Sequence, residues 1–516
     1  MTLRNGREGR VRPFRKGFLF FCVLTLLLPC AALAASDGFS TSYTYNFNYW
    51  GDVQESPDAY RVLTVVDSMT LGMENLDNVR ISRPQSLFAR GQDLYVCDTG
   101  NNRIIQLRRE GDTFSVARLI TGVNNSATPS FNTPTDVFAD EAGNLYVADS
   151  GNGRIVMMDR NLNWVRDYTK PADSTFDQSA EFIPHKVVVD TAGLVYCLVR
   201  NVNKGIAKFE ADGKFSGFIG ANKVSVSMTS YIWKRFFQSK TQRAQSEAFV
   251  PTEYENIAID GEGFIYATNT SFSEGDLMWD KAKPIRRINS LGNDILIKND
   301  RYPPIGELYW VEGSQAYGPS RLADITVLEN DNYVAVDRFR GRLFGYDEQG
   351  IMLWAFGTKG NMDGAFSYAI SIEHMGRDLA VLDQNENSVT VFEPTEYGNL
   401  IFDAQAMYLN GDYDGSADKW FEVLKMNANY PMAFRGVGRS LLRQNRFGEA
   451  MDYFKLAHDR TNYGRAFKLY RKDWVERNIW WILLVLAVLL IVPLAIGRAR
   501  RMKGEVIMHE YSKVRK

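Results

Sequence analysis

The chain has 516 residues, of which 45% are hydrophobic and 23% are charged, as in an ordinary globular protein. Its length exceeds the roughly 150 residues of one domain, so we expect two or more units. With 60 basic and 61 acidic residues, the net charge is −1, which gives no long-range field for a polyanion. This balance argues against a nucleic-acid partner.

The N-terminus has the three-part layout of a secretory signal peptide. Basic residues up to Lys16 precede an apolar run, Gly17–Leu28, and small side chains at Ala32 and Ala34 form a cleavage site. We predict that residues 1–34 are a signal peptide cut after Ala34. An uncleaved N-terminal anchor is the alternative.

A repeated unit with a period of about 50 residues follows. In both Pro84–Ile104 and Pro134–Ile155, a proline-led strand precedes an apolar strand that ends in Asp, and Gly-Asn-x-Arg-Ile comes next. Looser copies occupy residues 184–209, 251–288, 321–346 and 366–392. Six units of short strands that cannot bury their own faces are expected to pack radially.

These motifs resemble the NHL repeat family. The resemblance implies a mainly β fold, a six-bladed β-propeller over residues 41–395. It is strong in the first two units and weaker in the third and fourth, where Val199 and Asn269 stand in place of the Asp.

Two segments precede the first full unit. Residues 60–67 read as a strand that closes the ring by pairing with the last blade, since closure removes exposed edges. Before it, Tyr43, Tyr45, Phe47 and Tyr49 alternate with polar residues, which predicts a half-buried strand. Its aromatic row is either a packed face or a platform for stacking carbohydrate, and we expect the packed face.

From residue 396 to 478 the pattern becomes helical, and two segments match at a shift of 34 residues, the tetratricopeptide period. Gly438, Ala450, Phe454 and Ala457 occupy the positions where the two helices of such a repeat touch. The segment therefore resembles a short tetratricopeptide-like stem. Two repeats serve either as a structural stem or as a peptide-docking site.

An apolar stretch without charge, Ile479–Gly497, is long enough to cross a membrane as a helix. Trp480 and Trp481 suit one interface, and the basic segment 498–516 suits the cytoplasmic side. Behind a signal peptide, this stretch acts as a stop-transfer helix. We predict a single-pass protein of a bacterial cell membrane, with its N-terminal domains outside and its C-terminus in the cytoplasm.

The repeat-end residues recur from unit to unit, which favours a structural role over a single active site. They are Asp98, Arg103, Asp149, Arg154, Asp337, Arg342 and Asp383. At a strand end before a turn, such carboxylates are expected to accept hydrogen bonds from turn backbone. The sequence shows no catalytic constellation and assigns no binding or metal-ligating residues.

Residues 222–249 form an insertion before the fourth unit. Read as a helix, the insertion places Ile232, Trp233, Phe236 and Phe237 on one face. Such a face packs as a lid on the propeller or touches a membrane or partner.

Two function hypotheses remain. The first is a membrane-anchored binding or scaffold protein outside the cell, with a protein or glycan partner, as an accessory to an envelope transport or carbohydrate-uptake system. The second is a calcium-dependent propeller lactonase or lyase. Only His185 and His374 lie in the propeller, which excludes a histidine-rich zinc site but leaves a calcium site of carboxylates and asparagine open. We expect no cofactor and favour a protein that is not an enzyme.

Overall fold

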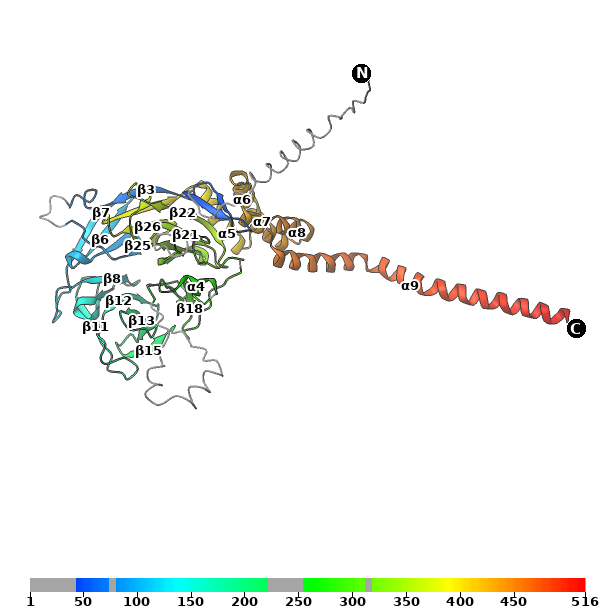
Figure 1. The fold of residues 1–516 in the computed structure, drawn as a ribbon, viewed down its shortest axis with the longest axis horizontal. Coiled ribbons are helices and arrows are strands. Elements are labelled where there is room, and N and C mark those ends of the chain that lie inside the picture. The colour runs from blue at the N-terminus through cyan, green and yellow to red at the C-terminus, as the bar shows by residue number, and fades with distance from the viewer. Residues whose placement is uncertain are drawn as a thin grey trace, which may run out of the picture. The chain divides into compact units, whose positions relative to one another are not determined.

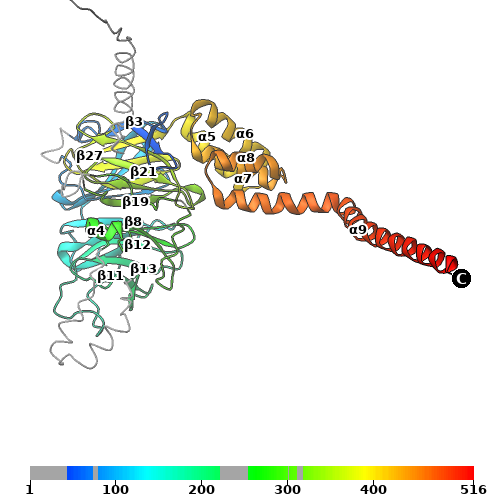
Figure 2. The ribbon, with the colours of Figure 1, turned by 45° about the vertical axis from the view of Figure 1, so that its right-hand side comes forward.

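The computed structural model describes residues 43–73, 80–220, 254–279, 281–299, 301–310 and 318–515. The predicted signal peptide (1–34) and insertion (222–249) lie outside these described residues. The chain divides into two compact units, Met1–Asn399 and Leu400–Lys516. The first consists mainly of strands and the second of helices (Figures 1 and 2).

The first unit is a six-bladed β-propeller, which confirms the fold predicted from the repeats. Each of its first three blades is a four-stranded antiparallel sheet, with the strands in chain order across the sheet. Blade one consists of β4 (Ser86–Arg90), β5 (Asp93–Asp98), β6 (Arg103–Glu110) and β7 (Thr113–Ile120). Blade two consists of β8 (Pro134–Ala139), β9 (Leu145–Asp149), β10 (Arg154–Met158) and β11 (Trp164–Tyr168). Blade three consists of β12 (Pro184–Val189), β13 (Val195–Val199), β14 (Ile206–Phe209) and β15 (Phe215–Ile219).

The last three blades are less regular. Blade four has β16 (Asn256–Ile259), β17 (Ile265–Thr268) and β18 (Ile285–Ile288), with the short helix α4 (Glu274–Met278) between the last two. Blade five has β19 (Leu322–Val327), β20 (Tyr333–Asp337), β21 (Arg342–Tyr346) and β22 (Met352–Phe356). A two-stranded link of β23 (Thr358–Lys359) and β24 (Ala365–Phe366) leads to blade six, which has β25 (Ala369–Met375), β26 (Asp378–Asp383) and β27 (Ser388–Pro394).

The strand β3 (Tyr60–Val66) closes the ring. It pairs antiparallel with β27, from Val66 opposite Val389 to Tyr60 opposite Pro394, and so supplies the outer strand of blade six. The predicted closure is confirmed. Strands from the beginning and the end of the propeller sequence therefore belong to one sheet. This shared sheet covers the outer edge of β27 and holds the ring closed.

The strand β1 (Thr44–Phe47) is more buried than its sequence pattern predicts. It pairs with β22 and with β2 (Val53–Glu55), which extends blade five to six strands. Tyr45 is fully buried in the blade-five core, as a packed face requires. Thr44 and Asn46 are also buried, so the strand is covered on both faces and the expectation of a half-buried strand is wrong. The alternation of polar and apolar residues gave the wrong burial for this strand, because a strand inside a large blade also buries its polar side chains.

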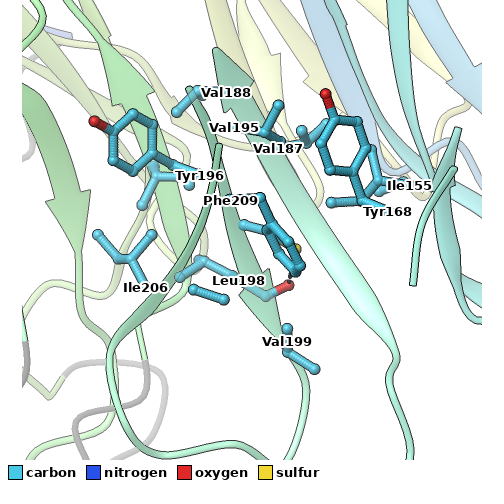
Figure 3. Close-up of a cluster of buried hydrophobic side chains, with 14 of the residues drawn as sticks. Ile155, Tyr168, Val187, Val188, Val195, Tyr196, Leu198, Val199, Ile206 and Phe209 are labelled. Atoms are coloured by element: carbon cyan, nitrogen blue, oxygen red, sulfur yellow. Dashed lines mark hydrogen bonds between the residues drawn. The ribbon is translucent and has the colours of Figure 1, made fainter. Parts of the chain in front are cut away.

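Side chains between neighbouring blades form the core. Figure 3 shows the cluster between blades two and three, where Tyr168, Val187 and Phe209 meet. The rings of Tyr168 and Phe209 pack edge to face with centroids 5.7 Å apart. Cys97 and Cys197 lie buried in different blades as free thiols. Each blade therefore depends on its neighbours for burial of its apolar faces.

The second unit contains helices α5 to α9. They are α5 (Glu396–Leu409), which begins in the first unit, α6 (Tyr413–Met426), α7 (Pro431–Arg443), α8 (Phe447–Leu456) and α9 (Arg460–Val514). Glycines allow close helix packing: an added Cβ at Gly438 would lie 2.7 Å from Phe454, and one at Gly436 would lie 2.3 Å from Trp420. The contact predicted between Gly438 and Phe454 is present. The tetratricopeptide assignment itself stays a prediction.

The helix α9 includes the predicted span. The helix expected near residues 463–478 and the apolar stretch Ile479–Gly497 form one continuous helix that extends to Val514 and contains Pro493. An 18-residue window within it has a mean hydropathy of 3.0, so by length and composition the helix could cross a membrane. Proline is tolerated inside such apolar helices. The boundary between stem and span therefore lies within one helix.

Candidate functional site in the central channel

The innermost strand of each blade places one polar side chain at the same level of the central channel. We call these residues the waist ring: Ser86, Asp136, Lys186, Asn256, Asp324 and Ser371. None of them exposes more than 6% of its surface. In four of the six strands, the pairing register shifts by one residue just before the ring position. Such a bulge redirects the next side chain, which explains how these residues reach the channel.

Asp136 joins three blades. Its carboxylate accepts hydrogen bonds from the Ser86 hydroxyl of blade one and, at 2.8 Å, from the Val187 N–H of blade three. The Lys186 ammonium lies 3.6 Å from the same carboxylate and donates to the Ser86 hydroxyl at 3.2 Å. The carboxylate therefore ties blades one, two and three together.

Asp324 does the same on the opposite half of the ring. It accepts a hydrogen bond from the Asn256 amide of blade four. From blade six it accepts the Ser371 hydroxyl at 2.7 Å and the Ile372 N–H at 2.9 Å. The Ser371 hydroxyl in turn accepts the Leu87 N–H of blade one at 3.1 Å. Two aspartates thus link blades one to three and four to six, and Ser371 joins the halves.

Electrostatics at the waist ring follow from burial. Burial raises the pKa of Asp136, and it raises the pKa of Asp324 to about 6, while Lys186 lowers both. For Lys186, burial opposes the charged form, but the carboxylates of Asp136 and Asp324 raise its pKa overall. Lys186 is therefore the internal counter-cation of the ring.

A calcium-dependent propeller enzyme needs carboxylates and an asparagine from different blades that converge in the central channel. The waist ring meets part of this requirement, because two carboxylates and Asn256 from different blades converge there. The donor set does not fit the ion, however. The oxygens of Asp136 and Asp324 already accept hydrogen bonds, and the ammonium of Lys186 supplies the positive charge beside them. Within the described residues, no group of three or more His, Cys, Asp or Glu is placed to hold a metal ion. Calcium would have to displace Lys186 to gain carboxylate ligands here.

A cavity of about 580 Å³, which we call the funnel, opens beyond the waist ring toward the C-terminal ends of the inner strands. Two residues after the ring position, the inner strands line it with Phe88, Phe138, Val188, Ala258 and Glu373. The equivalent residue of blade five, Thr326, is buried and its hydroxyl lies 2.7 Å from His374 Nδ1. Glu373 is the one ionisable side chain of this second ring.

Glu373 has weak internal partners. Its carboxyl receives the His374 N–H at 3.4 Å and the Thr326 hydroxyl at 3.5 Å, both at the limit of a hydrogen bond. Burial, and then the nearby Asp324, raise the pKa of Glu373 well above its usual value. The side chain still exposes 19% of its surface. It is thus the least satisfied acidic group that reaches the funnel from the inner strands.

A second cavity, of about 830 Å³, lies on the other side of the waist ring. Hydroxyl and amide groups such as those of Gln85, Thr135 and Asn385 line it. Its rim carries a repeated joint: Arg83 and Thr133 have positive φ, and their N–H groups donate to Asn387 and Asn102 at 2.8 and 2.7 Å. Each joint fixes the loop that leads into an inner strand, so much of this rim serves the connection between blades.

The predicted repeat-end residues lie at strand ends away from the waist ring. The carboxylate of Asp98 accepts the Ser82 N–H at 2.7 Å and the Arg103 guanidinium at 2.6 Å. Asp149 accepts the Asn132 N–H at 2.8 Å and Arg154 at 3.0 Å in the same geometry. The four side chains are buried. This arrangement anchors the link between blades to a strand end.

The pattern changes in the last two blades. Asp337 pairs with Arg340 at 3.0 Å, whereas Arg342 lies over the Tyr45 ring and donates to Gly357 O at 3.3 Å. Asp383 accepts backbone N–H groups, including that of Ser367 at 2.6 Å. The Arg of the motif therefore does not pair with the Asp in blade five.

The waist ring and Glu373 are not identified by the repeat pattern, because they are the positions at which the repeats differ. A usable signal exists: two residues after the strand-leading proline, Ser86, Asp136 and Lys186 differ while their surroundings repeat. A central site needs such unlike residues from different blades. His374 was noted only as one of two propeller histidines.

Comparison with known proteins supports the repeat type. The chain is 30% identical over 115 residues to NHL repeat-containing protein 3 of Homo sapiens, which covers 21% of this chain and 32% of that protein. Over the matched residues the chain is therefore similar to an NHL repeat-containing protein. The chain spans about a third of the length of that relative, so the match extends over only part of the propeller and of either protein. No family model matches the chain.

Solved structures with a related arrangement are enzymes in several cases. A catalytically inactive virginiamycin B lyase from Staphylococcus aureus with quinupristin has 13% identity and a TM-score of 0.39, and the match covers 64% of this chain and 87% of the lyase. A streptogramin B lyase has 11% identity and a TM-score of 0.37 over 62% and 95% of the two chains. A proposed gluconolactonase has 11% identity and a TM-score of 0.38 over 66% and 94%. Likeness at this level carries no inference about the activity of this propeller.

Proposed function

We propose that the protein is a membrane-anchored binding protein that holds a small ligand in the funnel of its propeller, outside the cell. One observation carries this proposal: the waist ring fills the channel with buried, mutually bonded side chains, whereas the funnel beside it is an open cavity. A cavity of this size, in which apolar side chains alternate with polar and charged ones, is suited to a small molecule that has both apolar and polar parts.

A blocked variant tests the binding role. Ala258→Trp places a large ring in the funnel, and Ala211→Trp, at an exposed turn of blade three, is the matched control. We expect compounds that raise the melting temperature of the wild type and of A211W to leave A258W unchanged. A ligand at about 100 times its Kd adds about 2.7 kcal/mol to the unfolding free energy, which is readily measured. Equal stabilisation of A258W would contradict binding in the funnel.

The rival function, a calcium-dependent lactonase or lyase, makes a different prediction. It requires stabilisation by calcium and chemical conversion of the bound compound. We expect neither: the melting temperature is unchanged by chelator, because Lys186 already neutralises the waist ring. Mass spectrometry of the bound compound after incubation separates the two functions, since a binding protein returns it unaltered.

The membrane anchor of the proposal rests on α9 and on its flanks. Trp480 and Trp481 are exposed at one end of the apolar stretch, and Arg498, Arg500 and Arg501 follow the other end. We expect protease added to intact spheroplasts to digest the propeller and to spare an epitope placed after Lys516 until the membrane is permeabilised. Digestion of that epitope from outside would reverse the orientation and move the funnel to the cytoplasmic side.

A further inference from the structure

The second ring of the inner strands lines the funnel with apolar side chains except at Glu373 and Thr326. Phe88, Phe138, Val188 and Ala258 give it an apolar wall, and the rings of Phe88 and Phe138 lie 4.7 Å apart. Opposite this run of blades one to four, blade six contributes the carboxyl of Glu373. At the level of the second ring, a ligand therefore meets an apolar wall on one side and the carboxyl of Glu373 on the other, while waist-ring residues, including Asp136, Lys186 and Asp324, line the floor of the cavity.

The charges around the funnel have one dominant sign. Near its opening, Asp140, Asp190 and Asp260 each accept backbone N–H groups of the turn that follows an inner strand, so they stay in place as fixed acidic groups. Arg90 belongs to the same wall: its guanidinium donates to Ala139 O at 2.7 Å and lies 5.8 and 5.7 Å from the centroids of the Phe88 and Phe138 rings. Lys186, which is paired with Asp136, lines the floor. Acidic side chains still outnumber these two basic ones in the lining of the funnel, which favours a cationic over an anionic ligand.

From this geometry we propose that the ligand is an organic cation: an ammonium group that pairs with Glu373, on an apolar body that packs against the Phe88–Phe138 side. The inference rests on the proposed function, because it names the ligand of the same funnel. An anionic ligand would meet the acidic groups of the opening. A polyhydroxylated ligand would leave its hydroxyls against Phe, Val and Ala, at the cost of unmade hydrogen bonds.

A bare divalent cation suits the funnel less well. Calcium takes six to eight oxygen ligands, and magnesium needs a nearly complete octahedron. The second ring offers the Glu373 carboxyl and the buried Thr326 hydroxyl, while the aspartates near the opening hold their turns. An ammonium ion needs only one carboxylate, and the Phe88 and Phe138 rings, which already face the Arg90 guanidinium, remain available as apolar surface for the body of the ligand. One acidic group in an apolar ring is therefore the minimum site for an amine.

Matched probes test the charge requirement. The probes are benzylammonium, 2-phenylethylammonium and 4-phenylbutylammonium, with the alcohols and carboxylates of the same skeletons, titrated by calorimetry into the full chain in nanodiscs. Empty nanodiscs correct for partition into lipid. We expect at least one ammonium to bind at least tenfold more tightly than its alcohol, and the carboxylates not to bind.

Variants locate the charge. Glu373→Gln keeps the shape of the side chain and is expected to weaken ammonium binding at least tenfold while leaving the alcohol unchanged. Glu141→Gln, at the funnel opening, is the control and should change ammonium binding less than threefold. The groups that face Glu373 are Asp324, Asp136, Lys186 and His374. Since binding a cation favours the ionised carboxyl, ammonium affinity should also rise with pH, and this slope should vanish in E373Q.

The outcomes separate the two proposals. If alcohols or carboxylates bind as tightly as ammonium probes, and A258W abolishes their binding, the funnel is a ligand site but the cation inference is wrong. If ammonium binds and E373Q binds it equally, the inference is also wrong. If no probe of any charge binds, both the cation inference and the proposed funnel site are contradicted.

Discussion

The waist ring and the second ring lie two residues apart on the same six strands, yet they treat polar groups in opposite ways. At the waist, Asp136 and Asp324 are each bonded to two neighbouring blades and Lys186 balances their charge. In the second ring, Glu373 has only long contacts and faces a cavity. Buried polar groups that satisfy one another specify structure, whereas an incompletely satisfied group beside a cavity is available to a ligand.

The largest effect is expected from Asp136→Ala. This change leaves the ammonium of Lys186 buried without its carboxylate, and the loss of one partner of a buried ion pair costs about 3–5 kcal/mol. Urea unfolding of the propeller measures it. The double variant Asp136→Ala/Lys186→Met should recover more than half of the loss. No recovery would show that hydrogen bonds to Ser86 and Val187, and not the charge pair, hold this half of the ring.

Next in size is the pH dependence that Asp324 confers. Burial raises the pKa of Asp324 from 3.8 to about 6, so between these values the folded state binds more protons than the unfolded state. Its contribution to the unfolding free energy is therefore greatest below about pH 4 and falls, by up to about 3 kcal/mol, as the pH rises through 6. The difference in stability between wild type and Asp324→Asn should show this slope. A difference that grows with pH would mean that the folded state favours the ionised carboxyl.

A smaller difference is expected between two repeat-end positions. Asp98→Ala removes a buried carboxylate that accepts the Arg103 guanidinium at 2.6 Å, whereas Asp383→Ala removes a carboxylate whose hydrogen bonds go to backbone N–H groups. Because a hydrogen bond to a charged group contributes about 1.5–3 kcal/mol, the first change should be more destabilising by about that amount. Thermal unfolding of both variants provides the comparison. Equal losses of stability would indicate that the motif stabilises the fold through hydrogen bonds to the turn backbone and not through its arginine.

The smallest effect is expected in the second ring. Glu373→Gln exchanges one partly exposed carboxyl with weak partners for an amide of the same shape, so the unfolding free energy should stay within about 0.5 kcal/mol of the wild type. Chemical denaturation at pH 7 tests this. A loss comparable to that of Asp136→Ala would place Glu373 in the structural network and would end the contrast between the two rings.

Local pattern was enough to predict the propeller, its six blades and its closing strand. The turn residues of Pro84–Ile104 and its copies set strand length, and residues 60–67 had the composition of an outer strand without a blade of their own. The burial of both faces of Thr44–Phe47 was not predictable, because it depends on β22, a strand more than 300 residues further along the chain.

The channel could not be predicted for a similar reason. The Leu87 N–H and the Ser371 hydroxyl are 284 residues apart in sequence and become neighbours only when the ring closes. No period of the sequence identifies Asp324 or Glu373, because the equivalent positions of most other blades hold different residues and the role of each depends on what those blades place opposite. Repeated residues in the sequence indicate how each blade folds. Residues that differ between the repeats indicate which side chains line the channel.

The pairing of β3 with β27 has a consequence for folding during synthesis. β3 pairs with β27, so its partner is synthesised more than 300 residues later. At about 5–20 residues per second, β3 waits for roughly 15–70 seconds with both of its edges unpaired. During this interval the apolar strand is exposed to other chains, so overproduction should lead to aggregates that pair through residues 60–66.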